Sequence, residues 1–142
     1  MSTEALTFGS FYFSSPTATA NATATPIKCA GATTAGSLNG FTHTSGNRLT
    51  YTGQATRTFE VISAFSMSAS AACSILFYFY KNGVLVPGAI SARKVSNNDV
   101  GSAGLGGLVS LGTNDYLELW CETDGGEDVT VAYGGMIVKV VG

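Results

Sequence analysis

Residues 73–83 read Cys-Ser-Ile-Leu-Phe-Tyr-Phe-Tyr-Lys-Asn-Gly. Aromatic and aliphatic side chains crowd this segment and an Asn-Gly pair closes it, which is typical of a β-strand that runs into a tight turn. Successive side chains of a strand point to opposite faces, so both faces of this strand are apolar or aromatic. A strand with one solvent-facing side would alternate apolar and polar residues. Because no segment of the chain reads as a covering helix, we expect other copies of the chain to cover the second face.

The segments on either side of residues 73–83 also read as strands. Apolar and polar residues alternate over residues 56–67, which predicts a half-buried strand. Phe59, Val61, Phe65 and Met67 lie on one face of it, and the opposite face is more polar as far as Glu60. Further strands are expected at 6–13, 27–30, 41–44, 49–52, 84–86, 89–95, 108–111, 116–122 and 129–141. In the last of these, Gly134-Gly135 indicates a bulge or a close backbone approach. Residues 31–40 read as a turn-rich link and 96–107 as a loop. About eight to ten short strands without a helix predict an all-β sandwich or barrel.

Length and composition indicate one domain over residues 1–142. Hydrophobic residues make up 45% of the chain and charged residues only 11%, a balance opposite to that of a disordered protein. Residues 14–26 differ from the rest: they consist mainly of Ser, Thr and Ala and contain Pro16, Asn21 and Pro26. We expect an extended loop or arm there, and we interpret the glycosylation-like triplet at Asn21 as a chance match.

The charge pattern limits the choice of partners. The formal net charge is −2 and no basic cluster is visible, so a nucleic-acid partner is not expected. So little charge on a small domain suggests that neighbouring molecules cover part of its surface. Glu4 and the lack of a basic stretch at the start do not fit a signal peptide. The uncharged residues 61–80 are long enough to cross a membrane, but their serines favour two strands and a loop, and no membrane partner is expected.

Residues able to carry chemistry are few. The cysteines, Cys29, Cys73 and Cys121, lack the spacing of a zinc site, and we favour free thiols in a reducing cytoplasm while leaving a disulfide between two of them open. His43 is the one histidine of the sequence and lies in a polar stretch, so an ordinary surface histidine is expected. No serine or cysteine nucleophile is assigned to it as a catalytic partner. No catalytic set follows from this pattern, so we expect neither an enzyme nor a cofactor.

Two other segments can each be interpreted as an ordinary structural element or as a functional site. Carboxylates cluster at Glu122, Asp124, Glu127 and Asp128, where a solvated turn is favoured over a Ca²⁺ site, and glycoside hydrolysis has weak support. The glycine-rich residues 101–112 lack the phosphate-binding pattern and its lysine, which favours a flexible loop.

Four aromatic residues leave two alternatives open. Tyr78, Tyr80, Tyr116 and Trp120 are either ordinary core or a subunit interface, where Tyr and Trp are enriched. The sequence supports both alternatives about equally, because a strand that is apolar on both faces fits either one.

Several short stretches resemble known families. Residues 49–53, 57–61 and 77–83 resemble the small jelly-roll domains of tailed-phage virion proteins. Residues 112–119, Gly-Thr-Asn-Asp-Tyr-Leu-Glu-Leu, are similar to the Gly-Asp-x-Val-x-Leu stretch of the complement C1q and tumour-necrosis-factor (TNF) superfamily. Residues 133–138 look like the last strand of that superfamily, and the resemblance extends over roughly residues 41–141. The chain has no collagen-like stalk, which favours the viral family over extracellular signalling.

The resemblance implies a fold and a function. The implied fold is an antiparallel jelly-roll sandwich that forms a homotrimer, with Tyr78, Tyr80, Tyr116 and Trp120 at the subunit interface. The implied function is that of a phage capsid decoration (cement) protein, made in the host cytoplasm and bound to the outer capsid surface of the virion. The major capsid protein is then a partner, and the arm with Pro16, Asn21 and Pro26 would contact the capsid. The alternative is the receptor- or glycan-binding head of a phage fibre.

Overall fold

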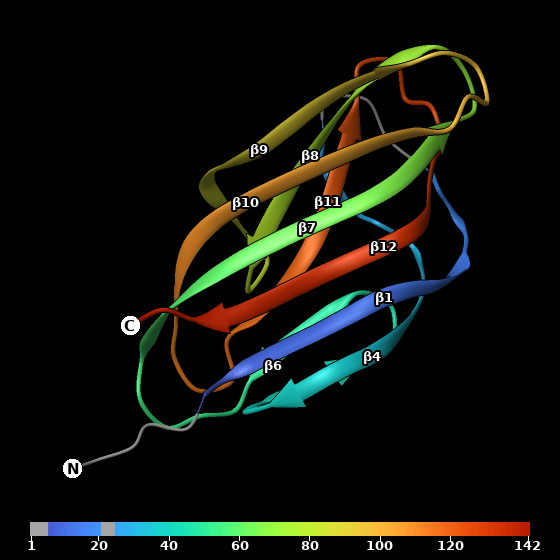
Figure 1. Cartoon of the computed structure of the whole chain (residues 1–142). Coiled ribbons are helices and arrows are strands. Elements are labelled where there is room, and N and C mark those ends of the chain that lie inside the picture. Colours follow the sequence, from blue (N-terminus) through green and yellow to red (C-terminus); the bar gives the residue numbers. More distant parts are fainter. Residues whose placement is uncertain (1–5, 21–24) are drawn as a thin grey trace.

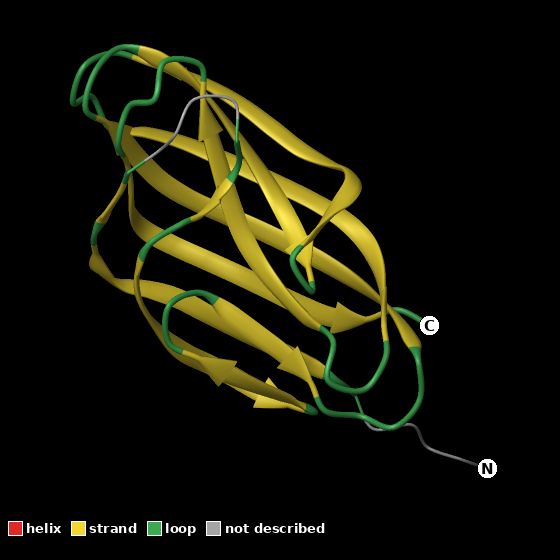
Figure 2. Cartoon of the chain, turned by 180° about the vertical axis from the view of Figure 1, so that it is seen from behind, coloured by secondary structure: helices red, strands yellow, loops and turns green. Residues whose placement is uncertain are grey.

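The computed structural model describes residues 6–20 and 25–142, and every helix or strand within them is a β-strand. The strands form two antiparallel sheets that face each other across one hydrophobic core (Figures 1 and 2). This arrangement confirms the predicted β-sandwich. In the described part of the chain there is no helix of the length and apolarity that crossing a membrane requires.

Sheet A contains the first and the last strand of the chain side by side. Its order is β10 (Gly101–Leu111), β7 (Arg57–Ala69), β12 (Val129–Val140), β1 (Phe8–Pro16) and β4 (Gly31–Asn39), and the two-residue β2 (Ala18–Thr19) pairs with β12. The register of the two central pairs places Ile137 of β12 opposite Ser10 of β1 and Ile62 of β7.

Sheet B contains the segment at residues 73–83. Its order is β5 (Phe41–Thr44), β6 (Arg48–Tyr51), β11 (Tyr116–Thr123), β8 (Cys73–Lys81) and β9 (Val84–Val95), and the two-residue β3 (Ile27–Lys28) pairs with β11. Asn82 and Gly83 both have positive φ angles, of 51° and 78°, as the predicted tight turn between β8 and β9 requires.

The two sheets bury one face each in the shared core. From β8 the core receives Ile75, Phe77 and Phe79, none more than 1% exposed. The alternation predicted for residues 56–67 is also confirmed, because Phe59, Val61, Phe65 and Met67 are all buried there. Ser63 shares their face, and its hydroxyl donates to the carbonyl of Gly135 at 2.6 Å, so the buried polar group is satisfied.

Three segments that were expected to be irregular contain strands. Residues 31–39 form β4 instead of a turn-rich link, and Ser14–Thr19 contribute to β1 and β2 instead of an arm. Residues 101–107 were expected to be a loop, but they extend the predicted strand at 108–111 into β10. Small and polar side chains give little strand propensity, but the backbone of β10 pairs with β7 along its whole length. Pairing with a neighbouring strand therefore overrides local preference in these segments. Pro16 lies exposed at the end of β1, Pro26 is half-buried just before β3, and Asn21 lies outside the described residues.

Both sides of the sandwich are closed by neighbouring strands. On one side the chain passes from β4 in sheet A to β5 in sheet B through the single residue Gly40. On the other side the edge strands β9 and β10 lie against each other (Figure 1).

Candidate self-association surfaces

The outer face of sheet A is unusually apolar for a free surface. Ile62 is 42% exposed and Ile137 is 54% exposed, and the two lie opposite each other in the register of β7 and β12. Tyr12 of β1 and Leu108 of β10 extend this face to both sides and are also exposed. Exposed apolar residues grouped on one face of a sheet are typical of an interaction site.

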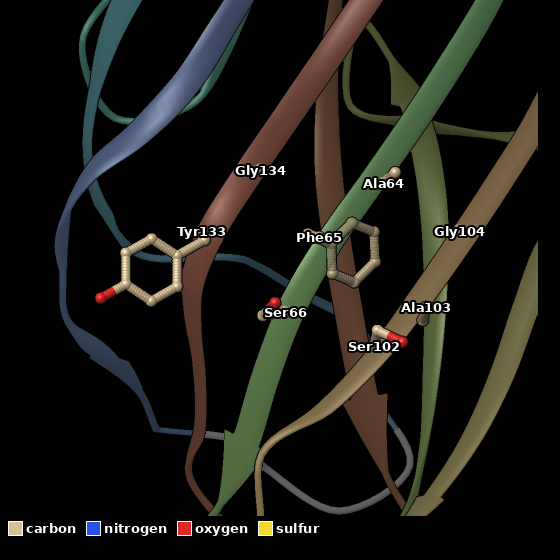
Figure 3. A pocket seen from close by; sticks show the side chains of 8 residues that line it. All are labelled: Ala64, Phe65, Ser66, Ser102, Ala103, Gly104, Tyr133 and Gly134. Atoms are coloured by element: carbon tan, nitrogen blue, oxygen red, sulfur yellow. The ribbon is translucent and has the colours of Figure 1, made fainter.

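A shallow trough lies farther along the same face, next to a projecting tyrosine. The trough has a volume of about 550 Å³ and is lined mainly by small residues of β7 and β10, namely Ala64, Ser66, Ser102, Ala103 and Gly104 (Figure 3). Tyr133 of β12 is 73% exposed and extends away from β7 (Figure 3). The small side chains leave the sheet surface open to close approach by another molecule.

Charge appears only toward the opposite end of this face. Lys139 of β12 and Glu60 of β7 are paired in the register, and Nζ lies 3.2 Å from Oε1. Both side chains are more than a third exposed, so the ion pair adds little stability. The more polar outer face predicted for β7 is therefore present at Glu60, but farther along the strand Ile62 and Ala64 make the same face apolar.

The outer face of sheet B is organised around the buried carboxylate of Glu118. Its Oε2 lies 3.0 Å from Nζ of Lys28 and 2.8 Å from Arg48, and Nε1 of Trp120 donates to Oε1 at 3.0 Å. Burial by itself would raise the pKa of Glu118, but the hydrogen bonds from Trp120, Lys28 and Arg48 outweigh it and lower the pKa below its ordinary value. The carboxylate is 2% exposed and stays ionised because its partners neutralise it.

The four predicted interface aromatics all lie on this outer face of sheet B. The rings of Tyr80 and Trp120 stack at 4.0 Å with an interplanar angle of 6°. Tyr78 is 7% exposed, and its hydroxyl donates to Oε1 of Glu122 at 2.6 Å. Burial and the nearby carboxylate of Glu122 both raise the pKa of the Tyr78 hydroxyl.

Tyr116 is covered from within the chain as well. The guanidinium carbon of Arg48 lies 3.8 Å from the centre of its ring, a cation–π contact. Side chains of the same sheet thus provide part of the cover that other copies were expected to provide. The role of the four aromatics in a subunit interface stays a prediction.

His43 is half-buried, where a surface histidine was expected. Its Nε2 lies 2.7 Å from the hydroxyl oxygen of Thr33, and its ring packs against Phe11. Burial lowers the pKa of His43. The Thr33 hydroxyl also accepts the amides of Gly46 and Asn47, so it serves the turn between β5 and β6.

The acidic residues at the start of the β11–β12 turn are used in several ways. Asp124 accepts the amide of Ser74 and Glu127 accepts the amide of Gly125, whereas Glu122 binds Tyr78. One ligand atom each from Asp124, Glu127 and Cys73 lies within 4.8 Å of the others. Among the described residues this cluster is the group best placed to hold a cation, and it includes a thiol that was not part of the predicted carboxylate site.

Sequence reasoning missed the apolar face of sheet A. Part of that face comes from residues 101–107 of β10, which were expected to be a loop, and the trough on it is lined mainly by Gly, Ala and Ser. The sequence feature that could have indicated this face is the pair Ile62 and Ile137. These residues lie on the opposite face of their strands from the core residues Val61 and Val138.

Comparison with known proteins shows the fold. No protein-family model matches the chain, and no curated protein does. Among solved structures, the TNF protein Eiger from S. frugiperda superposes with a TM-score of 0.66 at 9% sequence identity, over 96% of this chain and 93% of that one. Murine APRIL superposes with a TM-score of 0.62 at 8% identity, over 96% and 98% of the two chains. The chain is similar to these proteins over its full sandwich, and it therefore has a TNF-like jelly-roll fold.

Proposed function

We propose that the chain is a structural virion protein: a homotrimeric decoration, or cement, protein on the outer capsid surface of a tailed phage. In this role it bridges neighbouring coat subunits, and its partners are its own copies and the major capsid protein. Binding across subunit boundaries stabilises a shell by mass action, with no need for catalysis. The observation that carries the proposal is the exposed apolar face of sheet A around Ile62 and Ile137.

The chemistry of the described residues fits a role without catalysis. The half-buried His43 is bonded to Thr33, whose hydroxyl serves a turn, and Glu118 is neutralised by Lys28 and Arg48. We therefore propose no enzymatic activity and no cofactor. The low net charge of −2 supports protein partners over nucleic acid.

One pair of variants distinguishes the two candidate surfaces. Ile137→Glu places an unpaired charge on the outer face of sheet A, and Ile90→Glu places one on the outer face of sheet B, where Ile90 pairs with Tyr78. The two isoleucines are similarly exposed, at 54% and 49%, so they are matched controls for each other. Sedimentation should show a trimer for the wild type and for Ile90→Glu, and a monomer for Ile137→Glu, because a buried unpaired charge opposes association. The reverse pattern would assign the interface to the aromatic cluster instead.

The location of the protein is tested separately. Electron microscopy of virions labelled with an antibody against this chain should show the label over the head surface. Label confined to fibres would overturn the decoration role, and a wild-type monomer at micromolar concentration would remove its basis.

The second candidate is a receptor- or glycan-binding fibre head. The stacked rings of Tyr80 and Trp120 next to the carboxylate of Glu122 favour it, because sugars bind to aromatic faces flanked by hydrogen-bonding groups. Binding on a glycan array that Trp120→Ala abolishes, together with absent binding to capsids, would support this function over the first.

A further inference from the structure

Two of the three thiols lie next to each other inside the sandwich. Cys29 directly follows β3, and its amide donates to the carbonyl of Leu119 at 3.0 Å. Cys121 lies in β11 and pairs with Ile27 of β3. Cys29 is 1% exposed and Cys121 is 0% exposed, and their side chains are in hydrogen-bonding contact.

The third thiol has a different environment. Cys73 lies at the start of β8, where its side chain contacts the carboxylate of Glu127. Burial and the nearby carboxylates of Glu127 and Asp124 raise the pKa of Cys73 to about 11, which makes it a poor nucleophile. The chain therefore contains one thiol pair and one separate thiol that serves as an internal control.

We propose that Cys29 and Cys121 form a reversible disulfide when the folded protein meets a low-molecular-weight disulfide such as oxidised glutathione. The thiolate of Cys29 attacks one sulfur of glutathione disulfide, which forms a mixed disulfide and releases one glutathione thiolate. The deprotonated thiol of Cys121 then attacks the sulfur of Cys29 and expels the second glutathione thiolate. Two protein thiols are oxidised, one glutathione disulfide is reduced to two thiols, and the two protons pass to the released thiolates.

The shortness of β3 provides the route to these buried thiols. β3 has two residues and pairs with β11 through Ile27 and Lys28. Local opening of so short a strand costs far less than global unfolding, and it uncovers both thiols at once. Burial raises the pKa of Cys29 well above its ordinary value, so the reaction is slow until β3 opens.

The register also predicts that the bond is easily reduced. Cys29 is aligned with Leu119, so it is a diagonal neighbour of Cys121. Diagonal neighbours in an antiparallel pair have Cα atoms about 7–8 Å apart, slightly more than the usual disulfide span of about 4.4–6.8 Å. The bond forms only after residues 27–29 shift toward β11, and the resulting strain favours reduction. The disulfide is thus a redox-controlled cross-link that fixes β3 to β11 in the middle of sheet B.

The experiment counts thiols in the wild-type protein. Folded protein is incubated with oxidised glutathione, quenched with acid, unfolded, alkylated and analysed by mass spectrometry. One alkylated thiol, at Cys73, and a disulfide-linked peptide pair containing Cys29 and Cys121 are expected. The oxidised protein should also unfold at a temperature higher by roughly 10 °C, because the bond closes a loop of about ninety residues, and mild reductant should reverse this increase.

Two variants serve as controls. Cys73→Ala should still form the disulfide, whereas Cys29→Ala should show no rise in unfolding temperature with oxidised glutathione. Three alkylated thiols after prolonged incubation of the wild type would overturn the proposal. So would a link that involves Cys73, or a glutathione adduct that persists on Cys29. The peptide map of the wild type decides the question even if a variant fails to fold, and its result does not depend on the virion role.

Discussion

At the scale of single residues, Asn47 shows what sequence reasoning can and cannot supply. The turn at residues 45–47 is predictable, and Asn47 has the positive φ of 83° that Asn tolerates better than most residues. Its role inside the molecule is not predictable from the sequence. It is 0% exposed, its Nδ2 donates to the carbonyls of Cys29 and Leu119, and its Oδ1 accepts the amide of Leu119. One side chain thus joins the turn to β11.

Replacement of Asn47 should measure this link. We expect Asn47→Ala to lower the free energy of unfolding by about 3 kcal/mol, because three hydrogen bonds are lost and buried groups of Leu119 and Cys29 lose a partner. Asn47→Gly loses the same bonds but accepts a positive φ without strain, so it should be less destabilised than Asn47→Ala. Urea unfolding of both variants measures the difference. Equal stability of Asn47→Ala and wild type would contradict the structural role.

Glu118 makes folding depend on pH. Its pKa is lower in the folded chain than in the unfolded one, so its contribution to stability is fully present above the unfolded pKa. That contribution is lost as the pH falls through the lowered, folded value. We expect the wild type to lose stability in acid and Glu118→Gln to lose less, after an initial cost of about 2 kcal/mol at neutral pH.

A second carboxylate provides the control for this measurement. The pKa of Asp115 is also lowered, because its burial is outweighed by hydrogen bonds from Gly112 and Asn82 and by Lys81. Asp115→Asn should remove a separate part of the acid dependence. Unfolding curves over a pH series for the wild type and both variants test this assignment, and an unchanged acid slope in Glu118→Gln would refute it.

At the scale of strands, the sequence predicts those with large alternating side chains and misses those without. The aromatic and branched residues of β7, β8 and β11 predict strands, and in β7 their alternation also identifies the core face. β4 and β10 consist mainly of Gly, Ala, Ser and Thr, and their strand conformation comes from pairing with β1 and β7. Since that pairing is between residues distant in sequence, local propensity carries no trace of it. Of the two alternatives at Gly134-Gly135, the structure shows the close backbone approach, because a Cβ at Gly134 or Gly135 would overlap the carbonyl oxygen of Ala64 or Phe11. The register shift of β12 lies just before them, between Val131 and Tyr133.

Gly135 offers a test of how tightly the central strands of sheet A approach each other. A Cβ at this position would overlap the carbonyl oxygen of Phe11 and the Cα of Tyr12 on β1. Gly135→Ala should therefore separate β12 from β1 and destabilise the fold by about 3 kcal/mol or more. Gly106→Ala is the matched control, because its Cβ would lie 3.4 Å from the carbonyl oxygen of Val61, an ordinary contact. Thermal unfolding compares the two, and a similar small effect in both would be the contrary result.

At the scale of the whole molecule, the sandwich is predictable and the position of its uncovered apolar surface is not. Apolar residues on both faces of residues 73–83 predict that other copies of the chain cover the second face of β8. In the structure Tyr78 on that face is 7% exposed within the single chain, and the covering by other copies stays a prediction. Exposed apolar residues lie on sheet A at Ile62 and Ile137 and also on sheet B at Ile90. Part of the sheet A face is formed by β10, whose small residues give little strand propensity.

Self-association should make stability depend on protein concentration. If only the folded chain trimerises, the unfolding temperature of the wild type should rise by about 3 °C for each tenfold increase in concentration. Ile137→Glu should show no such dependence, because it blocks association without disturbing the core. Calorimetric scans over two decades of concentration measure this, with Ile90→Glu as the variant that should behave like the wild type.

The contacts that close both sides of the sandwich should affect how the protein aggregates at high concentration. At each side an edge strand of one sheet lies against an edge strand of the other, which should make these edges less accessible to a strand of another molecule. Edge strands that stay open can add further strands without limit, as they do in amyloid fibres. The single-residue step at Gly40 and the contact between β9 and β10 should therefore disfavour strand-by-strand polymerisation of the folded protein.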